Sequence, residues 1–218
     1  MQKLLTLMLL CCLLLCFAAQ AENGGTCGDD LTWSLSDDGS TLTVSGTGAM
    51  NDYYFEGELA PWKETVGMKP FNVVVEEGVT TIGDFAFVDC GLQSIALPES
   101  LESIGQYAFT HCVNLAEIAI PNSVTAIGER AFQVCEKLTD FVIPDGVTAI
   151  APGTFQLCAQ LASVTIPASI ETVGDNAFDQ CTALKDIYYG GTKKDWKKVR
   201  KGSSWKDGCP KKQTVHYQ

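Results

Sequence analysis

One pattern of apolar and polar positions repeats along most of the chain. In idealised form it reads L-x-x-I-x-I-P-x-x-V-x-x-I-G-x-x-A-F-x-x-C, and it occupies Leu92–Cys112, Leu115–Cys135, Leu138–Cys158 and Leu161–Cys181. A partial copy starts at Val73, and a half-copy ends at Tyr189. The period is 22 or 23 residues, as read from Phe87, Phe109, Phe132, Phe155 and Phe178. Such a period is typical of a leucine-rich-repeat solenoid, in which each coil buries its apolar side by stacking on its neighbours.

Within one coil, the pattern predicts a strand, a turn and a helical segment. In the copy that starts at Leu115, this residue, Ile118 and Ile120 are expected to point into the core. Pro121 ends the strand because it lacks the N–H that a sheet requires. Short helical turns are expected over Glu129–Cys135, because their apolar residues recur at helical spacing.

The same alternation leaves two rows of outward residues on the predicted parallel sheet. The first row holds Asn72, Ser94, Glu117, Asp140, Ser163 and Asp186, and the second holds Val74, Ala96, Ala119, Val142, Thr165 and Tyr188. An extended solenoid face is the usual binding surface of such proteins. We expect a protein or glycan ligand there, with Tyr188 as the best anchor, since binding hot spots favour Tyr. A solvated face without a partner is the alternative.

Candidate catalytic chemistry is sparse in this sequence. Glu117 and Asp140 hold the same position in adjacent coils, so their Cβ atoms should lie about 5 Å apart, near the carboxyl spacing of retaining glycosidases. A flat face supplies no walled pocket, so solvated like charges are favoured over a glycan-active enzyme or a weak calcium contact. His111 is expected to be exposed and unconstrained, and His216 to lie in a terminal strand. We therefore predict a non-enzymatic protein without a metal or another cofactor.

The cysteines do not predict disulfides, although their number invites the question. Five of them stand at one position per coil, where parallel Cβ vectors do not converge for a bridge, and a straight ladder cannot surround a zinc ion. They are expected to be small buried thiols. Cys27 and Cys209 belong to opposite ends of the solenoid, roughly 25–30 Å apart, and should not pair.

The two flanks differ from the repeats. Residues 1–21 read as a signal peptide, with Lys3, an apolar core and the Ala19-Gln20-Ala21 cleavage site; a membrane anchor and lipidation at Cys16 are the rival readings. No other stretch is long and apolar enough to span a bilayer. Leu31–Leu35 and Leu42–Val44, separated by an Asp-Gly turn, predict a β-hairpin. After the repeats, a short helix is expected over Asp195–Val199 and a last strand over Thr214–Tyr217.

The four tryptophans lie outside the full repeats, at Trp33, Trp62, Trp196 and Trp205, where they can seal the open ends of the core. Charge divides along the chain. From residue 22 to residue 191 there are 24 acidic and 5 basic residues, net −19, whereas residues 192–218 hold 2 acidic and 9 basic residues, net +7. The acidic body disfavours nucleic acid as a partner. The basic end either solvates a cap or contacts an envelope polyanion.

At the P-x-x-V-x-x-I-G-x-x-A-F-x-x-C units the chain resembles the BspA-like leucine-rich-repeat family of bacteria. The resemblance covers roughly Val73 to Tyr189 and extends to flanks such as Cys27 to Trp33. The resemblance implies a secreted or cell-surface protein, and some members of the family act as adhesins. The family has no catalytic residues that could be assigned to this sequence. Fold-level likeness alone is a weak guide to function.

These observations together predict an α/β repeat solenoid. We expect a leucine-rich-repeat right-handed coil with a parallel sheet on one face, short helical turns on another, a β-hairpin N-cap and a small C-cap. The expected divisions are a signal peptide (1–21), an N-terminal cap (22–69), five to six coils (70–191) and a basic C-terminal cap (192–218). The expected function is binding of a macromolecule as an extracellular adhesin or recognition module. A structural spacer without a specific ligand is the alternative.

Overall fold

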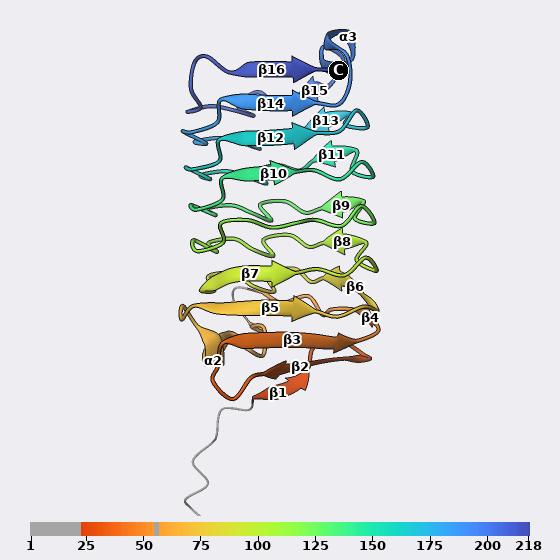
Figure 1. Cartoon of the computed structure of the whole chain (residues 1–218), viewed down its shortest axis with the longest axis vertical. Helices are drawn as coiled ribbons and strands as arrows, with labels where there is room; N and C mark the ends of the chain where they lie inside the picture. The colour runs from red at the N-terminus through yellow and green to blue at the C-terminus, as the bar shows by residue number, and fades with distance from the viewer. Residues whose placement is uncertain (1–22, 55–56) are drawn as a thin grey trace, which may run out of the picture.

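The computed structural model describes residues 23–54 and 57–218, so the expected signal peptide lies outside the described residues. The chain winds into a solenoid whose coils follow one another along the long axis, with the N-terminal cap at one end and the C-terminus at the other (Figure 1). Parallel strands from successive coils stack on one another, which confirms the predicted fold class.

The first column of strands forms the predicted sheet, but in two separate parts. The five-stranded part contains β1 (Gly24–Thr26), β2 (Leu31–Leu35), β3 (Thr41–Gly46), β5 (Phe71–Val75) and β7 (Leu92–Ala96). The four-stranded part contains β10 (Asp140–Val142), β12 (Ser163–Ile166), β14 (Asp186–Tyr189) and β16 (Thr214–Tyr217). Only β1, β2 and β3 pair antiparallel, as the predicted hairpin requires.

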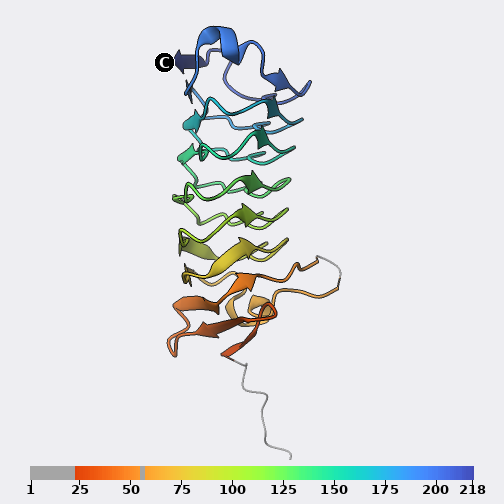
Figure 2. The same ribbon diagram turned by 90° about the vertical axis from the view of Figure 1, so that its right-hand side faces the viewer.

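A second column of short parallel strands follows the turn in each coil, and the sequence did not predict it. One sheet contains β4 (Gly48–Ala49), β6 (Val79–Ile82), β8 (Ser103–Ile104) and β9 (Ala126–Ile127); the other contains β11 (Ala149–Ile150), β13 (Thr172–Val173) and β15 (Arg200–Lys201). Figure 2 shows these strands one above another. Their inward residues are the V-x-x-I positions. The same residues therefore fill the core and belong to the strands that pair neighbouring coils in register.

The third side of each coil was expected to be helical, and this prediction was wrong. Residues such as Glu129–Cys135 form turns, in which two positions per coil adopt a left-handed backbone. Alternate backbone N–H groups of each turn donate to carbonyl groups of the equivalent turn in the next coil; Phe87 N, for example, donates to Ala108 O at 2.8 Å. A helix and this turn would both place Ala, Phe and Cys inside, so the apolar pattern could not distinguish the two backbone conformations.

His111 occupies one of the left-handed positions, with φ of 61°. It is exposed, as expected, but it is not unconstrained, because an L side chain rarely adopts this backbone. Its Nδ1 lies 2.6 Å from Oδ1 of Asp89, the equivalent residue of the preceding coil. The equivalent positions in later coils are Val134 (φ 58°), Leu157 (φ 64°) and Gln180 (φ 60°).

The core is a single file of stacked aromatic rings. The five repeat phenylalanines are fully buried, and neighbouring ring centroids along the file lie 5.2 to 5.8 Å apart with interplanar angles of 5° to 12°. Trp62 extends the file at the N-terminal end, where it stacks on Phe87 at 5.3 Å. Trp205 closes the other end edge-on against Phe178 at 6.1 Å. This stacking supports the predicted role of the caps.

The cysteines form a second file beside the rings, and all seven in the described residues are free. From the second of the repeat cysteines onward, the thiol donates to the carbonyl of the Phe in the preceding coil, for example Cys158 Sγ to Phe132 O at 3.1 Å. Burial raises the pKa of Cys90 to about 11 and that of Cys158 to about 12. Cys209 continues the same file by donating to Phe178 O. The repeated cysteine is therefore both a packing residue and a hydrogen-bond donor.

The N-terminal cap covers the first coil with the hairpin and with α2 (Lys63–Val66). Gly91 marks the coil that is one residue short. A Cβ there would lie 2.1 Å from the carbonyl oxygen of Lys69, so only glycine lets the coil pass this close to the cap. The Nε1–H of Trp62 donates to Ala86 O at 2.9 Å, which fixes the cap on the turn column.

The C-terminal cap is a degenerate further coil. Gly202-Ser203-Ser204-Trp205-Lys206-Asp207-Gly208-Cys209 follows the course of Gly174–Cys181, because Phe178 N donates to Trp205 O and Gln180 N to Asp207 O. The expected helix lies slightly earlier, as α3 (Lys193–Trp196), because Thr192 accepts from Asp195 N as its N-cap. The last strand, β16, was predicted correctly.

Candidate functional site

The two outward rows lie in register on the sheet, as the alternation predicts. Ser163 stands between Asp140 and Asp186, and Thr165 between Val142 and Tyr188. In the other part of the sheet, Asn72 pairs with Ser94 and Val74 with Ala96. The rows also extend beyond the predicted twelve residues, to Thr41 and Thr43 on β3 and to Thr214 and His216 on β16.

The structure departs from the prediction at Glu117 and Ala119. Their segment, Leu115–Ile120, is not a strand, although its sequence matches the pattern (Figure 1). Among the described residues, the backbone N–H and C=O groups from Glu117 to Ile120 make no backbone hydrogen bond. In the second column, β9 pairs with β8 and β11 with β13, but β9 and β11 are likewise not paired with each other. Both strand columns are therefore interrupted at this level of the solenoid.

The turn column remains continuous at the same level. Phe132 N donates to Thr154 O at 2.9 Å, and Val134 N to Gln156 O at 2.8 Å, as in the other coils. The coils therefore stay joined through their turns. On the sheet side, a long bond from Thr139 N to Ala116 O, at 3.4 Å, precedes the stretch from Glu117 to Ile120 that has no ladder. We call the interruption between β7 and β10 the sheet break.

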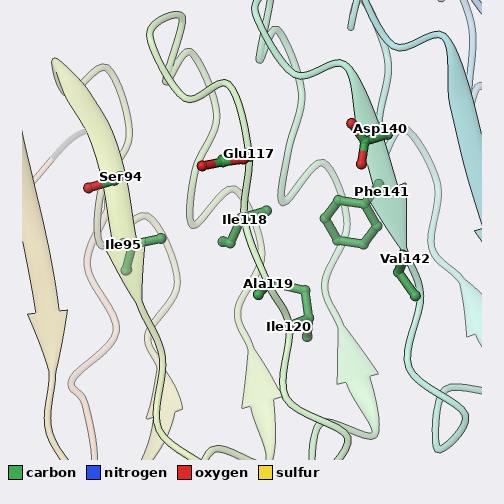
Figure 3. A pocket seen from close by; sticks show the side chains of 9 residues that line it. All are labelled: Ser94, Ile95, Glu117, Ile118, Ala119, Ile120, Asp140, Phe141 and Val142. Carbon is green, nitrogen blue, oxygen red and sulfur yellow. The ribbon is translucent and has the colours of Figure 1, made fainter.

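A hollow of about 550 Å³ lies over the sheet break. It is lined by Ser94, Ile95, Glu117, Ile118, Ala119, Ile120, Asp140, Phe141 and Val142 (Figure 3). Ile118 and Ile120 are partly exposed there, whereas the equivalent Val164 and Ile166 are fully buried. The volume falls within the range of about 300–1,000 Å³ that is usual for ligand sites. The break therefore turns part of a flat face into a concave, partly apolar one.

Two features of the sequence account for the break beside β10. Glu117 and Asp140 would stand directly opposite each other in a continuous ladder, and like charges in that arrangement are destabilising. Elsewhere in the row Ser163 separates the acidic residues. In addition, Phe141 occupies a core position that holds Val or Ile in other coils. Its ring is larger than those side chains and packs between Phe132 and Phe155, with centroids 4.9 and 4.7 Å away.

A second group of outward residues gathers at the C-terminal end of the face. Tyr188 stacks on His216 with ring centroids 4.6 Å apart, and His216 Nε2 lies 2.8 Å from Asp186 Oδ1. Tyr217 joins them around a smaller hollow of about 170 Å³. Sequence reasoning identified Tyr188 and Asp186 but missed Tyr217 and the contribution of His216. The match of Thr214–Tyr217 to Asp186–Tyr189 is the signal that could have found them.

The basic C-terminal cap presents most of its cations to solvent. Lys193, Lys194, Lys197, Arg200, Lys211 and Lys212 are exposed, and none of them has a salt bridge to a described residue. Lys198 pairs with Asp195 at 2.8 Å, and Lys201 lies over the ring of Trp196 at 4.2 Å. The charge split seen in the sequence is therefore a real feature of one end of the solenoid.

Comparison with known proteins identifies the repeat. The BspA type leucine rich repeat profile matches residues 69–194 as six copies, which is more than half of the chain. The chain belongs to this family. Proteins of the BspA type are generally non-enzymatic repeat proteins. No curated protein matches the chain.

Solved structures of other bacterial leucine-rich-repeat proteins share the fold. A T. pallidum leucine rich repeat protein is 28% identical, with 78% of this chain and 82% of that chain covered and a TM-score of 0.57. A leucine-rich repeat protein from Eubacterium ventriosum is 26% identical over 77% of this chain but only 44% of its own, with a TM-score of 0.62. The pneumococcal vaccine antigen PcpA, 21% identical with a TM-score of 0.57, covers 85% of this chain and 47% of its own, and shows the fold alone.

The two facing carboxylates of the sheet do not stand in an enclosed pocket. Glu117 and Asp140 are both exposed at the rim of an open hollow. Paired-carboxylate glycosidases instead work in walled pockets. Within residues 23–54 and 57–218, no group of three His, Cys, Asp or Glu could hold a metal ion. No helix in the same residues has the length and apolar character needed to cross a membrane.

Proposed function

We propose that this chain is a secreted or cell-surface protein that binds another macromolecule through the exposed face of its first strand column. In this role it would be an adhesin or a recognition module. The observation that carries the proposal is the hollow over the sheet break, where the face exposes Ile118 and Ile120 between Glu117 and Asp140. Concave apolar surfaces with a few polar groups at the rim are the usual form of binding sites.

Two further observations support this role. Val142, 59% exposed, lines the hollow, and Tyr188, 45% exposed, lies farther along the same face, so apolar contact area continues beyond the hollow. The apolar segment of residues 1–21, read as a signal peptide, favours export, and export would place the face outside the cell.

A binding screen tests the proposal. Wild-type protein and the Tyr188→Ala/Glu117→Ala/Asp140→Ala variant are applied to arrays of glycans and matrix proteins. A matched control, Tyr54→Ala/Glu102→Ala/Glu136→Ala, removes the same kinds of side chain from exposed positions outside the face. We expect a ligand whose binding is lost in the first variant and kept in the control. No binding by the wild type would favour a structural spacer, and turnover of a labelled polysaccharide would revive the enzyme.

We also propose a second contact, between the basic C-terminal cap and an anionic polymer of the cell envelope. The exposed lysines without a described acidic partner support it, because clustered cations attract polyanions until salt screens them. Retention on purified cell wall should fall with rising salt and fall again in a Lys193→Gln/Lys197→Gln/Lys211→Gln/Lys212→Gln variant. Equal retention of wild type and variant at low salt would refute this contact.

A further inference from the structure

The sheet break leaves hydrogen-bonding groups of an extended backbone unused in the middle of the molecule. The N–H and C=O groups from Glu117 to Ile120 make no backbone bond among the described residues, and β7 and β10 each end their part of the sheet there. Backbone donors and acceptors are almost always paired in folded proteins, and an unpaired strand edge is a template for another strand. Here the edges face an open hollow (Figure 3).

The lining of the hollow favours a polypeptide over a glycan. A peptide in extended form supplies N–H and C=O groups at the spacing that a strand edge requires, and its alternate side chains enter the pockets beside that edge. Ile118 and Ile120 offer apolar contacts for those side chains. Sugar rings, in contrast, stack on exposed aromatic faces, and the single aromatic residue of the hollow, Phe141, is only 1% exposed.

The acidic side chains at the rim of the hollow favour a peptide with positive charge. Glu117 and Asp140 are exposed, and neither forms a salt bridge with a described residue. The carboxylate of Asp140 accepts a hydrogen bond from Thr139 Oγ1 at 2.9 Å. A Lys or Arg side chain that projects from the bound strand would meet an acidic rim, and charge complementarity of this kind gives specificity.

We propose that the partner bound at the sheet break is an extended segment of another polypeptide that alternates cationic and β-branched residues. The segment adds as a strand to the unpaired backbone of Glu117–Ile120, places its apolar side chains against Ile118 and Ile120, and sets its cations against Glu117 and Asp140. This inference rests on the proposed function of the face and specifies the class of partner and the mode of its binding.

Three labelled peptides test the inference by fluorescence anisotropy. The first is Lys-Val-Lys-Val-Lys-Val-Lys; the second has the same sequence with alternate backbone amides N-methylated; the third replaces each Lys by Glu. The N-methylated peptide keeps its charge but loses its donors along one edge. We expect the first peptide to bind and the other two to bind about tenfold more weakly or worse. Hydrogen exchange should show new protection at residues 117–120 with the first peptide alone.

Conservative protein variants locate the site. Glu117→Gln/Asp140→Asn keeps the shape of the rim and should weaken binding of the first peptide about tenfold, whereas Glu102→Gln/Glu136→Gln, at exposed positions outside the hollow, should not. Equal affinity for the plain and N-methylated peptides would overturn strand addition, and equal affinity of the two protein variants would overturn the site. If a ligand found on the glycan and matrix-protein arrays requires Tyr188, Glu117 and Asp140 for binding while no cationic peptide binds, the proposed function stands and this inference fails.

Discussion

At the scale of single residues, backbone conformation matters as much as burial in this protein. The turn of every coil requires two left-handed positions, and most of them hold ordinary L residues such as Tyr107 and Val134. Left-handed backbone costs about 1–2 kcal/mol for a residue with a Cβ. The stacked turns hold these residues in place through hydrogen bonds to the next coil. The A-F-x-x-C motif gives no sign of this, because its spacing also fits a helix.

Relief of one such strain should stabilise the fold. Leu157 has φ of 64° and is 43% exposed, so Leu157→Gly removes backbone strain and little buried surface. We expect it to raise the free energy of unfolding in urea by about 0.5–1 kcal/mol. The control, Ala159→Gly, changes an exposed residue outside the left-handed positions and should lower it by a similar amount. A lower stability for Leu157→Gly would contradict the backbone assignment.

The buried thiols make stability depend on alkaline pH. An unfolded thiol has a pKa of about 8.5, whereas the folded pKa is about 11 for Cys90 and about 12 for Cys158. The folded state therefore keeps protons that the unfolded state releases. Stability from these groups is fully present below about pH 8.5 and is lost as pH rises through 11 to 12. Denaturation followed from pH 7 to 11 should show this decline, and Cys158→Ala should flatten it.

At the scale of elements, the repeat period allowed prediction of the first strand column, its register and both outward rows. These follow from alternation, which depends on each strand alone. The break at Leu115–Ile120 could not be predicted in this way, since that segment matches the pattern as well as any other. It depends on pairs of residues in neighbouring coils: the facing carboxylates of Glu117 and Asp140, and the ring of Phe141 beside Ile118.

Removal of one carboxylate should favour a continuous ladder. In Glu117→Ser the row would read serine beside Asp140, as it already does at Ser163. We expect the free energy of unfolding to rise by about 0.2–1 kcal/mol, the range of one cross-strand pair. Glu136→Ser, at an exposed position outside the sheet, serves as the control and should leave it unchanged. No difference between the two variants, measured by thermal unfolding, would rule out charge repulsion as a cause of the break.

At the scale of the whole molecule, the solenoid has a core of stacked phenylalanine rings with tryptophans at both ends, an acidic body and a basic C-terminal cap. The tryptophan positions outside the repeats predicted the seals, because a repeat that stacks on one side only leaves core exposed. The degenerate coil at 202–209 was not predicted, since it replaces the Ala-Phe pair of the motif by Trp205 and Lys206. Its backbone and the thiol of Cys209 still follow the course of the other coils.

The two seals should differ in their effect on stability. Trp62 is fully buried, stacks on Phe87 and donates to Ala86, so Trp62→Ala should lower the free energy of unfolding by about 3–5 kcal/mol. Trp205 is partly exposed and meets Phe178 edge-on, so Trp205→Ala should have a smaller effect. Guanidinium denaturation of both variants compares them. A greater loss at Trp205 would mean that the file is anchored from its C-terminal end.

The proposed binding face and the inferred strand addition both depend on the sheet break, and amide hydrogen exchange of the unliganded protein tests it most directly. The amides of Ile118 and Ile120 should exchange much faster than those of Val164 and Ile166, which lie in a paired strand. The amide of Phe132, bonded in the turn column of the same coil as Ile118, should stay protected and so exclude unfolding of the coil. Equal protection of Ile118 and Val164 would show a continuous sheet and contradict the account.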